Sequence, residues 1–200
     1  MKIIRLEPLI ERGSFPLTEE FKQIEAEVRM AVDEVKWPTG SDRFTLNNHS
    51  KQCNGVTPIK TSCVDYLVSV GWKREQRMKI ASKTQPGNID VIKELSDGRY
   101  FALEWETGNI SSSHRALNKM AIGMIDSILA GGILILPSRA MYYWLTDRIG
   151  NYSELEPYFR VWKSIQSIRD GYLGVLEVEH DDLSPDAPRI AKGTDGRALR

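Results

Sequence analysis

Two short stretches rich in apolar residues, joined by a Ser-Asp-Gly turn, constrain the fold of this chain more than any other feature. Residues 89–95 and 99–106 carry mainly branched and aromatic apolar side chains, which is typical of β-strands. The connecting residues 96–98 end in Asp-Gly, which favours the positive backbone φ of tight hairpin turns. The sequence therefore predicts an antiparallel β-hairpin at residues 89–106.

The acidic residues of this hairpin include Asp90, Glu104 and Glu106. Because side chains alternate across a strand, Glu104 and Glu106 share one face and Trp105 takes the other. A two-residue turn would pair Asp90 with Trp105, on the face opposite the glutamates. A three-residue loop with a glycine bulge would pair Asp90 with Glu104 instead. The turn residues fit both arrangements, and only the second brings the three carboxylates together.

Converging carboxylates have a specific chemistry. They repel one another and lose hydration, so they shift their pKa values or bind a cation. Hard divalent ions such as Mg²⁺ favour oxygen sites of this kind, often shared with the phosphates of a substrate. A solvated strand face would carry the same glutamates, and the hairpin alone leaves both readings open.

A helix with a polar start is predicted directly after the hairpin, over residues 111–130. Its apolar stripe runs from residue 117 to residue 128, and Arg115, Asn118 and Lys119 lie on the opposite face. Asn109 and Ser111 lie at or before its first turn. Amide donors, small polar side chains and an arginine at a helix start suit phosphates and base edges. Ordinary capping and a solvated face would give the same pattern.

The remaining patterns predict an α/β protein, with a mixed β-sheet flanked by helices on both faces. Gly131-Gly132 is expected to end the helix and to precede a buried strand. The length of 200 residues fits a single domain over residues 1–200, with an irregular tail at about 181–200. Further helices are predicted at residues 17–35, 57–71, 142–148 and 153–162, and strands at 133–136 and 172–178.

Composition excludes several classes of protein. Equal numbers of basic and acidic residues, 27 of each, give a formal net charge of zero, whereas proteins that coat nucleic acid non-specifically are usually basic. Any phosphate contacts must therefore come from a local cleft. The start of the chain lacks a secretory apolar segment and no run is long enough to cross a membrane, so a cytoplasmic location is expected. Cys53 and Cys63 are too few for a disulfide framework or a zinc site.

Six blocks of sequence, in the same order, strongly resemble type II restriction endonucleases. The similarity spans about residues 37–196. It implies a restriction-endonuclease-like core and a homodimer that cleaves double-stranded DNA. The resemblance further implies that cleavage requires Mg²⁺, uses no nucleotide cofactor and occurs at the palindrome GGATCC. The blocks are NNHSKQCNGVTPIK (47–60), GNIDVIKE (87–94), EWETGNISSSHRALNKM (104–120), YYWLTDR (142–148), YSELEPYF (152–159) and AKGTDG (191–196).

The resemblance also implies roles for individual residues. It implies that Glu75, Asp90 and Glu104 bind the metal, together with the backbone carbonyl of Trp105. Glu106 completes the implied catalytic acids as the general base or water-orienting group. Since Arg can bond to guanine, Asn to adenine and Asp to cytosine, the implied base readers suit a site that mixes G·C and A·T pairs. These base readers are Asn109, Ser111, Arg115, Asp147, Arg148 and Asp195.

Other readings of the same residues remain open. Residues 121–128, AIGMIDSI, carry less charge than the resemblance predicts for subunit contacts, which makes Met124 and Ile128 candidates for dimer packing. A sequence-specific DNA-binding protein with a structural cation and no cleavage is the main alternative function. A glycosidase using Glu104 and Glu106 is disfavoured, because two residues on one strand do not easily flank a glycosidic bond.

Overall fold

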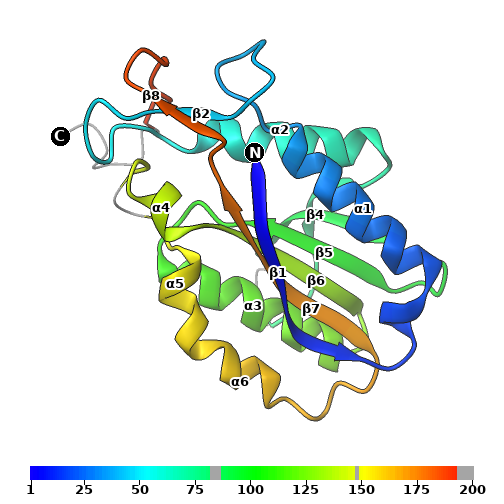
Figure 1. The fold of residues 1–200 in the computed structure, drawn as a ribbon. Coiled ribbons are helices and arrows are strands. Elements are labelled where there is room, and N and C mark those ends of the chain that lie inside the picture. The colour runs from blue at the N-terminus through cyan, green and yellow to red at the C-terminus, as the bar shows by residue number, and fades with distance from the viewer. Residues whose placement is uncertain (82–86, 147–148, 193–200) are drawn as a thin grey trace.

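A six-stranded mixed β-sheet forms the centre of the molecule in the computed structural model, which describes residues 1–81, 87–146 and 149–192 (Figure 1). The inner strands β5, β6 and β7 are parallel to one another. Strand β1 pairs antiparallel with β7, β4 pairs antiparallel with β5, and β3 pairs antiparallel with β4. The order across the sheet is β1 (Lys2–Arg12), β7 (Gly171–Glu179), β6 (Leu129–Pro137), β5 (Tyr100–Trp105), β4 (Asn88–Glu94) and β3 (Lys73–Arg77).

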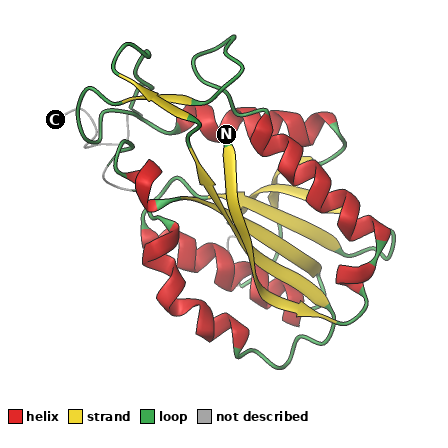
Figure 2. Ribbon diagram, in the orientation of Figure 1, coloured by secondary structure: helices red, strands yellow, loops and turns green. Residues whose placement is uncertain are grey.

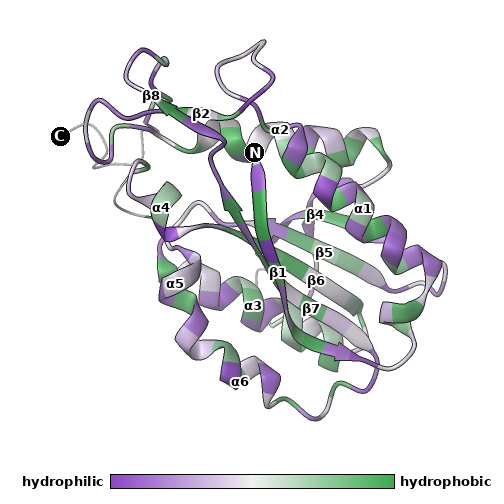
Figure 3. Cartoon of the chain, in the orientation of Figure 1, coloured by the Kyte–Doolittle hydropathy of each residue, from purple (hydrophilic) through white to green (hydrophobic). Residues whose placement is uncertain are grey.

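Helices cover both faces of this sheet, which confirms the predicted α/β class (Figure 2). One apolar cluster packs beneath α1 and α2, and a second packs beneath α3, α5 and α6. Figure 3 shows hydrophobic residues along the central strands and hydrophilic residues on the outer side of α1. The helices are η1 (Phe15–Leu17), α1 (Glu19–Asp33), α2 (Thr57–Ser69), α3 (Ile110–Ile125), α4 (Arg139–Tyr142), α5 (Tyr152–Leu155), η2 (Glu156–Tyr158) and α6 (Phe159–Lys163).

Helix α1 illustrates how local sequence produces these elements. The side chain of Thr18 accepts a hydrogen bond from the backbone N–H of Phe21 at 3.1 Å, which caps the helix. Phe21, Ile24 and Val28 follow at helical spacing and are all buried against the sheet. The helix predicted at residues 17–35 is therefore present with slightly shorter bounds.

The hairpin between β4 and β5 has the three-residue loop. The backbone N–H of Leu95 donates to the carbonyl of Arg99 at 2.9 Å, and Gly98 has a φ of 84°, which glycine adopts without steric cost. Val91 pairs with Leu103, so the register continues to place Asp90 opposite Glu104. Of the two turns that the sequence allowed, this one brings the acids to the same side.

The predicted end of the helix at Gly131-Gly132 is wrong. Helix α3 ends at Ile125, and the two glycines lie inside the buried strand β6. A Cβ atom on Gly131 would lie 2.2 Å from the carbonyl oxygen of Tyr172 on β7. Gly131 is therefore required for the close approach of two strands, and it does not act as a helix terminator.

The suggested role of Met124 in dimer packing is also wrong, whereas that of half-buried Ile128 stays a prediction. Met124 is only 6% exposed and lies in the core beneath α3, and Ile128 packs against the same cluster. The exposed apolar residues of this helix are Ile122 and Ile125. A helix is only partly specified by its apolar content, because its rotation about its own axis decides which residues face the sheet.

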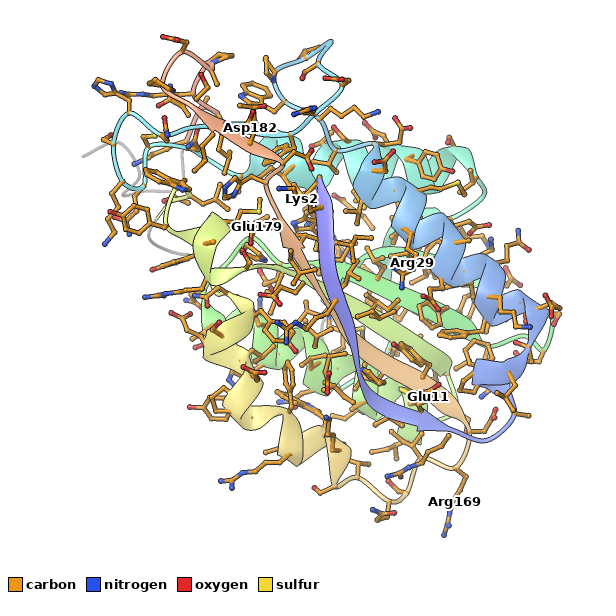
Figure 4. The ribbon with its side chains drawn as sticks, in the orientation of Figure 1. Lys2, Glu11, Arg29, Arg169, Glu179 and Asp182 are labelled. Carbon is orange, nitrogen blue, oxygen red and sulfur yellow. The ribbon has the colours of Figure 1, made fainter. Side chains whose placement is uncertain are left out.

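Four strands were not predicted: β1, β3 and the two strands of a small parallel sheet, β2 (Thr45–Asn47) and β8 (Asp182–Ser184). Strands β1 and β3 form the two edges of the large sheet and carry many charged residues, as sheet edges commonly do. Figure 4 shows β1 running along β7, with Lys2 and Glu179 at one end of the pair and Glu11 at the other.

Part of the tail predicted as irregular is ordered through the pairing of β8 with β2. Across the described residues, none of the helices is both long enough and apolar enough to span a membrane.

Candidate active site

The hairpin acids meet beside the first turns of α3. Asp90 lies on β4, Glu104 lies on β5, and Glu106 follows directly after β5. All three line one cavity of about 200 Å³. Its other lining residues are Lys60, Asn88, Trp105, Ser112, Arg115, Ala116 and Lys119.

Asp90 is the most highly connected of the three acids. Its Oδ2 accepts a hydrogen bond from the backbone N–H of Trp105 at 2.9 Å, and its Oδ1 lies 2.6 Å from Nζ of Lys60. Its own backbone N–H donates to Oε2 of Glu104 at 3.3 Å. These contacts fix the carboxylate in place and bring a cation from α2 to it.

Glu104 is largely buried and is paired with a second lysine. Nζ of Lys119, on α3, lies 3.4 Å from Oε1 of Glu104 and donates to the carbonyl of Asn88 at 2.7 Å. Burial raises the pKa of Glu104 to about 7, and the negative charge of Asp90 contributes in the same direction. Lys119 opposes this shift but does not cancel it.

Glu106 lies in the turn that leads into α3. Burial raises its pKa, and a hydrogen bond at 2.6 Å from the backbone N–H of Gly108 partly opposes this rise. A Cβ atom on Gly108 would lie 2.8 Å from Oε1 of Glu106, so the glycine allows the backbone to approach the carboxylate closely. A carboxylate with a raised pKa accepts a proton more readily near neutral pH, as a general base must.

Glu75 approaches the site from the edge strand β3. The pairings of Arg74 with Val91 and of Gln76 with Ile89 place Glu75 across from Asp90. Glu75 is exposed and has a φ of 47°, an uncommon conformation for a residue other than glycine. With Asp90 it lines a second cavity of about 180 Å³ on the other side of the aspartate.

The donor chemistry of the site fits a hard divalent cation. Asp90, Glu104 and the main chain of Trp105 line one cavity and offer only oxygen donors. Within the described residues, no three Asp, Glu, His or Cys side chains are close enough to hold one ion as they stand. Lys60 and Lys119 instead supply the positive charge, so a bound cation would replace their ammonium groups.

Three of the six implied base readers lie at the start of α3. Asn109 caps the helix, with its Oδ1 accepting from the backbone N–H of Ser112 at 3.2 Å. Ser111 and Arg115 line a groove of about 710 Å³ along α3, and Arg115 also borders the acid cavity. Asp147, Arg148 and Asp195 lie outside the described residues.

Sequence reasoning did not find the pairing of the lysines with the acids. The sequence predicts only a polar helix face for Lys119, and no motif around Lys60 pairs it with an acid. Lys60 is 30 residues from Asp90 along the chain, and Lys119 is 15 residues from Glu104. No local pattern could have revealed these ion pairs, because they depend on how α2 and α3 dock on the sheet.

Comparison with known proteins agrees with this geometry. A family model described as restriction endonuclease BamHI matches residues 1–197. The type II restriction enzyme OkrAI of Oceanobacter kriegii is 50% identical over 200 residues and covers 100% of both chains. The chain belongs to the BamHI family of restriction endonucleases. The enzyme is accordingly a type II site-specific deoxyribonuclease.

One further relative supports the family assignment, and one solved structure supports the fold. The type II restriction enzyme BamHI of Bacillus amyloliquefaciens is 36% identical, and the alignment covers 92% of this chain and 91% of that protein. A crystal structure of restriction endonuclease BglII with a DNA 16-mer matches with a TM-score of 0.63. At 13% identity, over 90% of this chain and 79% of that chain, it supports the fold alone.

The raised pKa of Glu104 predicts a pH-dependent gain in stability from Glu104→Gln. The folded-state pKa of about 7 exceeds the ordinary value of 4.5, so ionisation destabilises the fold as the pH rises across this interval. Relative to the wild type, the free energy of unfolding of the variant should increase between pH 5 and pH 8 by on the order of 2 kcal/mol. Urea unfolding in EDTA measures this difference.

The exposed acid Glu34 provides the control for this measurement. Glu34→Gln should show a much smaller change between the two pH values, because its carboxylate is hydrated in both the folded and the unfolded chain. An equal effect for both variants would show that Glu104 is not the source of the pH dependence.

Proposed function

We propose that this enzyme is a Mg²⁺-dependent homodimer that hydrolyses double-stranded DNA at GGATCC. The observation that carries the proposal is the convergence of Asp90, Glu104 and Glu106 in one cavity beside the start of α3. Membership of the restriction endonuclease family supports site-specific cleavage of DNA. The crystal structure of BglII, which has a similar fold, contains bound DNA and supports DNA as the substrate. The specific sequence rests on the resemblance to enzymes of this family.

The proposed metal ligands are Asp90, Glu104, the carbonyl of Trp105 and Glu75. A divalent ion held there supplies charge neutralisation at the scissile phosphate and lowers the pKa of water. Glu106 orients the attacking water and accepts its proton at a carboxylate oxygen, which its raised pKa favours. Arg115 and Lys119 border the same cavity and place positive charge where a phosphate would enter.

Recognition and cleavage are coupled through the short backbone between Glu106 and the first turn of α3. In the proposal, Asn109, Ser111 and Arg115 read base edges from this helix start, together with Asp147, Arg148 and Asp195. Only a few residues separate Asn109 from Glu106. A shift of the helix when the enzyme is bound to a wrong DNA sequence therefore also displaces Glu106, the proposed general base. Specific contacts can therefore control cleavage as well as binding.

The proposal is tested by digestion of a DNA of known sequence that contains one GGATCC site, followed by sequencing of the ends. We expect two discrete fragments with Mg²⁺ and no cleavage in EDTA. Cutting at another sequence would refute the proposed site, and cutting in EDTA would refute metal dependence. Tight binding to GGATCC without cleavage under all metal conditions would favour the alternative of a sequence-specific DNA-binding protein.

We place the dimer contact on the outer surface of α3 and the adjoining η2 and α6. These segments are joined by a ring contact between His114 and Tyr158, with centroids 4.6 Å apart. The surface they form exposes large apolar residues, which commonly mark protein interfaces. The exposed residues are Ile122, Ile125, Tyr158 and Val161.

Ile125→Lys should therefore shift the protein from dimer to monomer and reduce double-strand cleavage. Ile125 is 47% exposed, so the charge harms the isolated subunit little but would be buried in the contact. Analytical ultracentrifugation measures the change. Leu17→Lys, at a residue 75% exposed on η1, is the matched control and should remain dimeric. An unchanged association constant for Ile125→Lys would place the contact elsewhere.

We further propose that residues 1–200 act as one domain and that the enzyme works in the cytoplasm, where a restriction enzyme meets incoming DNA.

A further inference from the structure

Three segments that are far apart in the sequence meet at the side chain of Asn54. This residue lies after β2 and is 0% exposed. Its Nδ2 donates to the carbonyls of Asn47 at 2.8 Å and Trp144 at 3.0 Å. Its Oδ1 accepts from the backbone N–H of Ile190 at 3.4 Å. One amide thus joins the loop after β2, the segment after α4 and the stretch after β8.

The backbones of the same segments also contact one another directly. The N–H of Asn54 donates to the carbonyl of Trp144 at 3.1 Å, and the N–H of Gly55 donates to the carbonyl of Ile190 at 2.8 Å. A Cβ atom on Gly55 would lie 2.0 Å from the carbonyl oxygen of Ala191. The three main chains are therefore packed as closely as neighbouring strands.

A second buried amide extends this arrangement toward β8. Nδ2 of Asn47 donates to the carbonyls of Pro185 at 2.9 Å and Ala187 at 2.6 Å. An asparagine amide offers two donors and an acceptor, which matches the carbonyls and the N–H that it meets here. Aspartate has the same shape but offers no donor, so it would leave these buried carbonyls without a partner.

The joined segments lead directly to proposed base readers. Trp144 precedes Asp147 and Arg148 by three and four residues, and Ile190 precedes Asp195 by five. We propose that Asn54 is a positioning residue that holds the stretches at Trp144 and Ile190, which lead to these base readers, relative to each other and thereby sets sequence discrimination. The inference rests on the proposed function, because it takes the base-reading roles from there.

A positioning role differs measurably from a structural one. If Asn54 only stabilised the fold, its loss would reduce the fraction of active enzyme and lower cleavage of every DNA site by the same factor. If it positions two recognition segments, its loss lowers cleavage of GGATCC more than cleavage of sites with one altered base pair. The ratio of the two rates therefore separates the roles.

The test compares kcat/KM for a GGATCC duplex and for duplexes altered at one base pair, using Asn54→Asp and wild-type enzyme. Circular dichroism and the unfolding midpoint establish that each protein is folded at the assay temperature. We expect the discrimination ratio of Asn54→Asp to fall about tenfold or more, since one correctly placed base contact contributes about 1–3 kcal/mol. Asn47→Asp, which keeps the Asn54 bond to Trp144, should produce a smaller fall.

The matched control is Glu27→Gln, another buried polar residue, which accepts hydrogen bonds from Trp72 and Lys93, neither of which belongs to the three joined segments. It should lower stability and leave the ratio unchanged. The inference is overturned if folded Asn54→Asp discriminates as the wild type does, or if Glu27→Gln loses discrimination equally. A wild-type enzyme without preference for GGATCC would refute the proposed function itself.

Discussion

Glu106→Ala should strongly reduce cleavage of the proposed site, GGATCC, while specific DNA binding remains. We expect a loss of about 10³-fold in the single-turnover rate, which is within the range for removal of a general base. The side chain lies in the acid cavity and its pKa is raised by burial, so the substitution removes the proposed proton acceptor. Gel shifts with Ca²⁺ measure binding, and rapid quench with Mg²⁺ measures cleavage.

Glu94→Ala is the matched control for this prediction. Glu94 lies on the same hairpin, but it is exposed and is paired with Lys73 at 2.7 Å. Its removal should leave both binding and cleavage unchanged. Full cleavage by Glu106→Ala would remove Glu106 from the mechanism, whereas a loss of binding together with cleavage would indicate a role in assembling the site.

Gly131→Ala should destabilise the fold by about 3 kcal/mol, at the upper end of the usual cost of overpacking a core. The added methyl group would meet the backbone of β7, with 2.2 Å to the carbonyl oxygen of Tyr172, and a ring carbon of Phe101 at 2.8 Å. Neither neighbour can move freely, since both lie in the sheet. Urea denaturation measures the change in the free energy of unfolding.

Gly87→Ala is the control for the glycine prediction. A Cβ atom there would meet only the end of the Lys119 side chain at 3.4 Å, an ordinary contact distance. Its stability should stay within about 0.5 kcal/mol of the wild type. A small effect at Gly131 would mean that β6 and β7 can separate without loss, contrary to the packing described above.

Local patterns were sufficient for several parts of the fold. The hairpin follows from two strand-like stretches and an Asp-Gly turn, and α1 follows from apolar residues at helical spacing. The helix start at Asn109 was also visible, because a side-chain cap acts within one turn of the chain. Asp90, Glu104 and Glu106 could be proposed as one group from the alternation of side chains, provided that the turn had the right length.

Other parts depended on contacts that a local pattern does not record. The edge strands β1 and β3 are rich in charge because their outer sides face water, so their sequences resemble surface loops. Glycine commonly ends a helix, which is why the sequence predicted a helix end at Gly131. In the structure, Gly131 instead allows β7 to pack closely against β6.

The sequence by itself determined which residue types are available for the chemistry and which short elements carry them. Only the tertiary structure decided that the turn places Asp90 opposite Glu104, that Lys60 and Lys119 neutralise these acids, and that Asn54 joins three distant segments. The physical reason is range. Backbone preferences and side-chain periodicity act over a few residues, whereas these contacts form only when helices and strands far apart in the chain pack together.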